Sequence, residues 1–213
     1  MGHVWQPRPE PGWRVETKRR SPESVFRTLR PLYSANVHSP LITGEPFTVY
    51  FEGEIRQGDN EDAIRLALGF VAGEDGASKM PGCERWSLGV QCSEGRLFVN
   101  GKVVESVHTG AFEPGQQLGI GLNYAVSNGV QQLEDNGIST DSPSSIDIEV
   151  FITRDGKKIG GWKLCDQLNE SEGLSFEGLE GRHDLYAAVG ILGEVNVDIL
   201  FEKKDWLFED NLR

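Results

Sequence analysis

The stretch Ser145–Leu164, SIDIEVFITRDGKKIGGWKL, carries the clearest structural signal in this chain. Its first half alternates apolar residues with others, and this period of two is typical of a strand with one buried face. Asp155 and Gly156 then favour a type I′ turn, because both central positions of that turn need positive φ. Phe151 falls on the second face, so we expect a central strand that is covered on both sides. The stretch therefore predicts a β-hairpin inside a sheet.

The pairing within this hairpin follows from the same residues. A two-residue turn places Ile152 opposite Ile159 on one face of the hairpin. The pair Gly160 and Gly161 favours a bulge, which would change the direction of Trp162. We therefore expect a regular hairpin with one irregular position near its end.

Other segments along the chain show a similar alternation between turn residues. They are Phe47–Ile55, Ile64–Val71, Trp86–Cys92, Arg96–Val104, Gln117–Ala125 and Leu185–Phe201. Gly53 interrupts the first of them as a bulge would, and Asn100-Gly101 predicts a second tight hairpin turn. Helical periodicity is nearly absent. These patterns predict an all-β antiparallel sandwich or barrel.

The N-terminal part differs from the rest in composition. Met1–Arg20 contains three prolines and reads as an extended arm. The simpler interpretation of Trp5 and Trp13 is that they anchor this arm to the body of the protein; the alternative is a docking motif. Ser21-Pro22-Glu23 resembles a helix start, so a short helix is expected from Pro22 to about Leu29. We accordingly divide the chain into an arm with a short helix (1–32) and a β-sandwich domain (33–213).

Length and charge limit the classes of function. The 213 residues fit one domain, and the net charge of −12 should repel nucleic acid and anionic lipid. The basic run Lys18–Arg20 reads as a solvated patch. Three cysteines without CxxC spacing favour neither a disulfide framework nor a zinc site. With no membrane-length apolar run and no visible leader, we expect a cytoplasmic or nuclear protein without metal or cofactor.

Seven segments, in order and spacing, resemble the SPRY domain. They are VYFEGEI (49–55), IRLALGF (64–70), MPGCERWSLGV (80–90), SEGRLFVNG (93–101), PGQQLGIGLN (114–123), IEVFITRDGKKIG (148–160) and LYAAVGILGEVNVDILF (185–201). The nearest likeness is to SPRY domains of the Ran-binding protein M type, over roughly Val49–Phe208. The sequence departs from that pattern at Cys83, where the family has Trp, and in the inserted stretch Val126–Ser144. The resemblance implies a curved, jelly-roll-like sandwich of two antiparallel sheets.

The same resemblance implies binding of a partner protein's peptide or loop by edge loops. Many relatives are substrate-recognition parts of ubiquitin-ligase or trafficking assemblies. Carried onto this chain, the binding surface falls on the loop before MPG, on the turn after LYAAVG and on the segment ahead of the first matched strand. The candidate residues are Pro40, Leu41, Glu74, Asp75, Lys79, Met80, Tyr124, Ile191, Leu192, Gly193 and Glu194.

For two groups of candidate residues, the sequence is consistent with more than one role. Met80 and Leu192 are either contact anchors or residues folded onto the core. The acidic residues Glu74, Asp75 and Glu194 are either solvated charges or a means of selecting a basic segment.

Residue patterns for catalysis are weak. The histidines show no metal-ligand spacing, and a GxSxG nucleophile motif is absent. Glu52 and Glu54 have the spacing of paired glycosidase carboxylates, but a solvated acidic pair is the simpler interpretation. We therefore expect no enzyme. A lectin-like sandwich is the alternative, with sugar rings stacked on Trp86 or Trp162.

Overall fold

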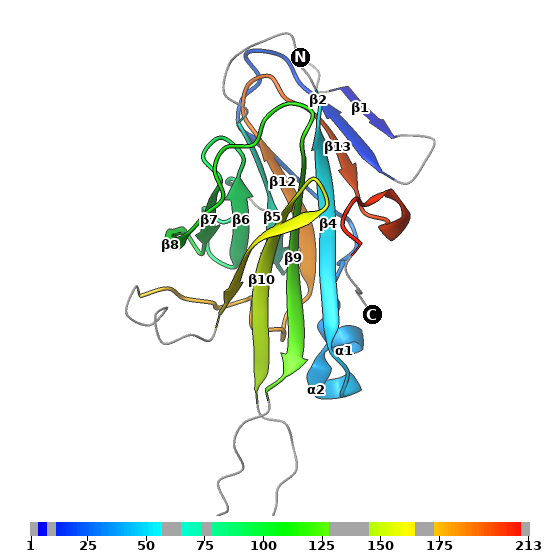
Figure 1. The fold of residues 1–213 in the computed structure, drawn as a ribbon, viewed down its shortest axis with the longest axis vertical. Coiled ribbons are helices and arrows are strands. Elements are labelled where there is room, and N and C mark those ends of the chain that lie inside the picture. Colours follow the sequence, from blue (N-terminus) through cyan, green and yellow to red (C-terminus); the bar gives the residue numbers. More distant parts are fainter. Residues whose placement is uncertain are drawn as a thin grey trace, which may run out of the picture.

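The computed structural model describes residues 4–7, 12–56, 65–73, 78–127, 145–164 and 173–209, and Figure 1 shows them as two packed antiparallel sheets. The seven-stranded sheet contains, in spatial order, β1 (Val4–Pro7), β2 (Trp13–Glu16), β13 (Asn196–Leu200), β4 (Phe47–Ile55), β9 (Gln117–Val126), β10 (Ile146–Arg154) and β11 (Lys157–Lys163). The six-stranded sheet contains β3 (Ser24–Arg27), β12 (Leu185–Ile191), β5 (Leu66–Ala72), β6 (Ser87–Gln91), β7 (Arg96–Val99) and β8 (Lys102–His108). The expected all-β antiparallel sandwich is confirmed.

Three short helical segments accompany the sheets: α1 (Ala35–His38), α2 (Pro40–Thr43) and the 3₁₀ helix η1 (Lys203–Asp205). Within the described part of the chain, no helix is long and apolar enough to cross a membrane.

The main core lies between the two sheets, where alternating side chains of facing strands meet. Phe51 of β4 and Phe70 of β5 join the sheets in an edge-to-face contact, with ring centroids 5.3 Å apart. Tyr33 and Tyr124 stack at 4.6 Å near one end of the same core. The apolar residues of the period-two pattern are thus the ones that are buried between the two sheets.

The hairpin of β10 and β11 forms as expected, with one difference in register. Asp155 and Gly156 have φ values of 48° and 74°, as a type I′ turn requires. Ile152, however, pairs with Gly160, and the register shifts before Thr153. The expected pairing of Ile152 with Ile159 is therefore wrong, because Ile159 is the extra residue of the bulge and is 40% exposed.

Strand β10 is central, as its second apolar face indicated. It pairs with β9 on one side and β11 on the other. Phe151 is buried on the outer face of the sheet, where it contacts Tyr50 and Phe208. The covering segment comes from the C-terminal end of the chain, which the sequence did not predict.

The N-terminal expectations need correction. The helix expected from Pro22 to about Leu29 is wrong, because Ser24–Arg27 forms edge strand β3 and pairs with β12. Strand β2 pairs with β13. Trp13 packs edge-to-face on Phe201, whereas the side chain of Trp5 lies outside the described residues. Because β2 and β3 belong to the two sheets, the division at residue 32 has no counterpart in the sandwich.

Gly53 does not form the expected bulge. It pairs in regular register with Leu118 of β9 and with Ile199 of β13. A Cβ atom at this position would lie 2.7 Å from Leu68 Cδ1 of the opposite sheet. The glycine therefore permits close packing between the sheets.

The direction of β4 separates two ends of the sandwich. Its first residue, Phe47, lies four positions after the end of α2. Its last residue, Ile55, pairs with Val197, near the start of β13. The eight steps between its nine residues, at about 3.3 Å each, place these ends roughly 26 Å apart. In Figure 1, α1 and α2 lie at the lower end of β4, and β2 lies at its upper end.

Candidate functional site

The turn between β12 and β13 is fixed by backbone hydrogen bonds to two other segments. Leu192 N donates to Arg65 O at 2.9 Å, and Gly193 N donates to Ser21 O at 3.0 Å. Thr17 Oγ1 donates to Gly193 O at 2.7 Å. Gly193 has a φ of 77°, a conformation that glycine adopts without a steric penalty. The turn is therefore held in one position, with Leu192, Gly193 and Glu194 all partly exposed.

The loop that carries MPG lies on the outer face of the six-stranded sheet. Pro81 covers Gly89, where an added Cβ would lie 2.5 Å from the Pro81 carbonyl oxygen. Met80 and Pro81 also cover Gly190 of β12, with Pro81 Cδ 2.7 Å from an added Cβ. Met80 N donates to Glu23 Oε1 at 3.3 Å. These glycines provide the flat surface on which the loop reaches the turn after β12.

Four segments thus meet at one end of the sandwich, and we call them the rim. The rim consists of Lys18–Glu23, Arg65, Ser78–Met80 and Leu192–Glu194. Two of the three segments implied by the family resemblance lie here, with Lys79, Met80, Leu192, Gly193 and Glu194. Sequence reasoning missed the contribution of Lys18–Glu23 and Arg65, and the basic run Lys18–Arg20 was the signal that could have marked it.

The remaining candidates do not join the rim. Pro40 is buried and Leu41 half-buried in α2, at the opposite end of β4. Ile191 is fully buried in the core. Glu74 and Asp75 lie outside the described residues. The sequence-predicted site is therefore split between two ends of the molecule.

Tyr124 is a core residue. It is 0% exposed, stacks on Tyr33 and donates from its hydroxyl to Leu179 O at 3.3 Å. Burial raises the pKa of this phenol well above its ordinary value. The side chain is closed to a partner, although it stands near the start of the inserted stretch.

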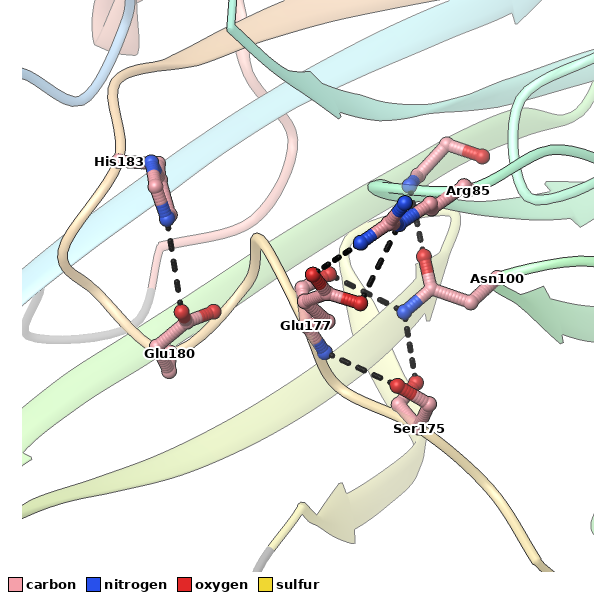
Figure 2. Close-up of polar contacts among 7 residues, drawn as sticks. Arg85, Asn100, Ser175, Glu177, Glu180 and His183 are labelled. Carbon is pink, nitrogen blue, oxygen red and sulfur yellow. Dashed lines mark hydrogen bonds and ion pairs between the residues drawn. The ribbon is translucent and has the colours of Figure 1, made fainter.

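A second polar cluster, shown in Figure 2, holds residues 173–184 against the β6–β7 region. Asn100 Nδ2 donates to Ser175 O at 2.7 Å and to Glu177 O at 3.1 Å. Its Oδ1 accepts from Ser87 N at 3.1 Å. Arg85 and Glu177 form a two-point ion pair, and Arg85 holds the pKa of Glu177 below its ordinary value. The cluster works as a clamp between segments distant in sequence.

The two tryptophans considered as sugar platforms are engaged within the protein. Trp162 is 9% exposed and packs on Phe176, with centroids 5.5 Å apart. Trp86, at a φ of 62°, stacks on His183 at 5.5 Å and lies against Gly178. Neither indole forms an open aromatic surface of the kind that sugar stacking needs.

Glu52 and Glu54 do not form the expected solvated pair. Glu52 is 1% exposed and accepts hydrogen bonds from Tyr50 Oη at 2.6 Å and from Leu207 N and Phe208 N at 3.0 Å each. Gln117 Nε2 donates to Oε2 of this carboxylate, the oxygen that also accepts from Leu207 N. Glu54 instead forms an ion pair with Arg56 at 3.0 Å. Glu52 is therefore a structural residue whose carboxylate fixes the C-terminal segment.

Across the described ranges, no group of three or more His, Cys, Asp or Glu side chains is placed to hold a metal ion. Cys83 is a half-buried free thiol and Cys92 a buried one. Burial raises the pKa of both thiols, which makes them weak nucleophiles and weak metal ligands.

Comparisons with known proteins bear on the fold. No protein-family model matches this chain, and no curated protein sequence matches it. A human SPRY domain is similar in structure at 16% identity, with a TM-score of 0.52, over 89% of this chain and 91% of that chain. The SPRY domain of human HERC1 is similar at 10% identity, with a TM-score of 0.51, over 89% of each chain.

A third similar structure is the carbohydrate recognition domain of Emp46p. It is 11% identical, has a TM-score of 0.53, and the match covers 93% of this chain and 84% of that chain. At such identities these likenesses speak to the fold alone. The two sheets and these neighbours together show that the chain has a SPRY-like β-sandwich fold.

Proposed function

We propose that this protein is a non-catalytic interaction module that captures a peptide or loop of a partner protein at the rim. The observation that carries the proposal is the convergence of four chain segments at one end of the sandwich. A turn fixed by three hydrogen bonds presents Leu192 there, and half-buried Met80 lies over Gly190, two residues before Leu192. Rigid elements that present loops of this kind are suited to recognition of an extended segment.

The family resemblance extends this proposal. The order of the matched segments resembles SPRY domains of the Ran-binding protein M type, and the SPRY neighbours support an interaction module. On that basis we propose a substrate-recognition adaptor in a ubiquitin-ligase or trafficking assembly. The sparse cysteines without disulfide spacing support a cytoplasmic or nuclear location.

A lectin is the second candidate, favoured by the structural likeness to the carbohydrate recognition domain of Emp46p. Engagement of Trp86 and Trp162 inside the protein counts against the sugar-stacking version of it. Specific retention on a glycan array would support the lectin and displace the peptide-binding proposal.

The test is affinity capture from a native lysate, with wild type beside the rim variant Leu192→Ser/Glu194→Gln. Ile42→Ser/Glu45→Gln is the matched control, because it changes an exposed apolar residue in α2 and an exposed acid just after it, at the opposite end of β4. We expect a protein that wild type and control enrich and the rim variant loses, with similar melting temperatures for all three. Loss in the control alone would move the site to α2 and overturn the rim proposal.

A further inference from the structure

Three serines of this chain precede a proline: Ser21, Ser39 and Ser142. A serine followed by proline suits the cleft of proline-directed protein kinases, because proline holds the residue before it extended and brings no backbone N–H that would need a partner. Access to the hydroxyl then decides whether such a serine can be a substrate. Ser142 lies outside the described residues, and the fold treats Ser21 and Ser39 very differently.

The fold closes access to Ser39. This residue is 5% exposed, and its carbonyl oxygen accepts from Ile42 N and Thr43 N at 2.9 Å each. The proline that follows it, Pro40, is buried at the start of α2. A kinase binds several residues on both sides of the serine as extended chain, so it would reach this hydroxyl only after α2 unfolds.

Ser21 lies on the connection between β2 and β3, where the chain is open to solvent. Residues 18–20 and 22–23 are exposed, and Ser21 itself is partly exposed. Its Oγ accepts from Lys18 N at 3.0 Å in an exposed hydrogen bond. Backbone hydrogen bonds from Ser21 N to Lys18 O at 2.8 Å and from Gly193 N to Ser21 O at 3.0 Å hold the segment. Local opening of this connection costs less than unfolding a buried segment such as that of Ser39.

Ser21 is also joined to the turn that presents Leu192. Because Gly193 N donates to Ser21 O, the backbone of Ser21 lies beside the residue that follows Leu192. A phosphate on the serine would carry a charge of about −1.5 to −2 at pH 7 together with its hydration shell. Beside a partly exposed apolar residue, this group raises the free-energy cost of removing water when a partner buries that residue.

We propose that Ser21 is a phosphorylation site for a proline-directed kinase and that phosphate on Ser21 prevents partner capture at the rim. Ser21 Oγ forms a bond to the γ-phosphorus of a nucleoside triphosphate, and the bond from that phosphorus to the β–γ bridging oxygen breaks. The hydroxyl proton passes to a carboxylate of the kinase, and the nucleoside diphosphate leaves. The regulatory half of the proposal rests on the interaction function proposed above, whereas the modification half does not.

The first measurement locates the phosphate. The full chain carrying Ser142→Ala is incubated with a purified proline-directed kinase and Mg-ATP, and mass spectrometry follows each serine. Peptides of residues 15–27 and 33–45 give the kinase's preference without the fold. We expect the ratio of the Ser21 rate to the Ser39 rate to be at least about tenfold higher in the folded chain than between the peptides. Ser21→Ala/Ser142→Ala is the matched control and should take up no phosphate at position 21.

The second measurement compares partner capture from a native lysate before and after phosphorylation. The phosphorylated Ser142→Ala chain should enrich the partner at least about tenfold less than the same chain incubated with kinase alone, without nucleotide. Removal of the phosphate by a phosphatase should restore capture to within about twofold, because the polypeptide is then unchanged.

Each outcome bears on one half of the proposal. No phosphate at Ser21, or the same ratio of rates in the folded chain and the peptides, would overturn the modification site. Phosphate at Ser21 with unchanged capture would overturn the regulation. Wild-type capture by Leu192→Ser/Glu194→Gln would overturn the rim function and the regulation with it, while the mass measurement alone still decides the modification. Capture that is lost on phosphorylation and regained with phosphatase supports the proposal.

Discussion

The outer face of the seven-stranded sheet and the rim use charged side chains in opposite ways. On the sheet face, Glu52 is 1% exposed, and its carboxylate accepts four hydrogen bonds from within the protein. At the rim, Lys18, Arg19 and Arg20 are exposed on a turn. A buried charge has to be paired at its site, whereas an exposed one is also stabilised by water.

The sheet face already holds its own peptide, the C-terminal strap, Glu202–Glu209. Trp206 meets Tyr50 edge-to-face at 4.8 Å, and Phe208 packs on Tyr50 and Phe151. Two backbone N–H groups of the strap, those of Leu207 and Phe208, donate hydrogen bonds to the Glu52 carboxylate. Burial and the neighbouring Glu52 raise the pKa of Tyr50, which keeps its hydroxyl a donor.

The same sandwich therefore keeps one segment permanently bound and presents another surface to solvent. The strap has aromatic burial and a paired buried charge, so its removal should unfold the protein. The rim contributes little burial of its own, so changes there should alter binding and leave stability intact. Four sets of variants test this contrast, in order of decreasing effect on stability.

Glu52→Gln should lower the free energy of unfolding by about 3 kcal/mol. The amide keeps the size of the side chain, but Leu207 N and Phe208 N donate to different carboxylate oxygens, so the single amide oxygen can accept from only one of them. Urea unfolding measures the loss, with the exposed Glu113→Gln as a control that should change stability by less than about 0.5 kcal/mol. A loss below about 1 kcal/mol for Glu52→Gln would mean that the strap does not depend on this carboxylate.

Gly89→Ala should destabilise by about 2 kcal/mol and also weaken partner capture. The new methyl group would lie 2.5 Å from Pro81 O, so the loop that carries Met80 must move off the sheet. Chemical unfolding and lysate capture test the two effects. Gly160→Ala is the matched control, because its nearest neighbour, Thr109 Cγ2, is 3.9 Å from the added carbon. Unchanged capture in folded Gly89→Ala would remove Met80 from the binding surface.

Asn100→Asp should cost about 1.5 kcal/mol. The carboxylate can still accept from Ser87 N, but it loses both donors to Ser175 O and Glu177 O. Hydrogen exchange should therefore speed up across residues 173–184 and stay slow in β12. Uniform exchange in both regions would show that the clamp in Figure 2 is not what holds this segment.

The triple variant Lys18→Gln/Arg19→Gln/Arg20→Gln should change the free energy of unfolding by less than about 0.5 kcal/mol, because the three side chains are exposed. The turn itself is held by backbone groups, which these substitutions keep. Thermal unfolding checks this directly. A large loss of stability would place the basic run among the residues that build the sandwich and would end its contrast with Glu52.

Local patterns predicted the strands and tight turns well, because they depend on neighbours in the chain. The turns at Asp155-Gly156 and Asn100-Gly101 both have the positive φ values that their residues favour. The same local logic failed at Ser21-Pro22-Glu23, where helix-start residues precede edge strand β3. Pairing with β12 outweighs a weak preference for helix over so short a segment.

The candidate site was predicted only in part. Motif order along the chain placed Met80 and Leu192 correctly in loops, yet it carried no information about which loops share an end of the sandwich. Pro40 and Leu41 fall at the opposite end because β4 separates them from the β12–β13 turn. Tyr124 stands next to a long inserted stretch in sequence, but its ring points into the core.

The all-β class, the two type I′ hairpins and the SPRY resemblance can be read from the amino-acid sequence, since alternation and turn chemistry are local properties. Three features depend on long-range packing: Glu52 is a buried acceptor, β2 and β3 complete the sheets, and the turn at Lys18–Arg20 lies beside Gly193. Those relations join residues more than a hundred positions apart. They follow from which faces the sheets bury and which backbone groups remain to be paired, and no short window of sequence contains that information.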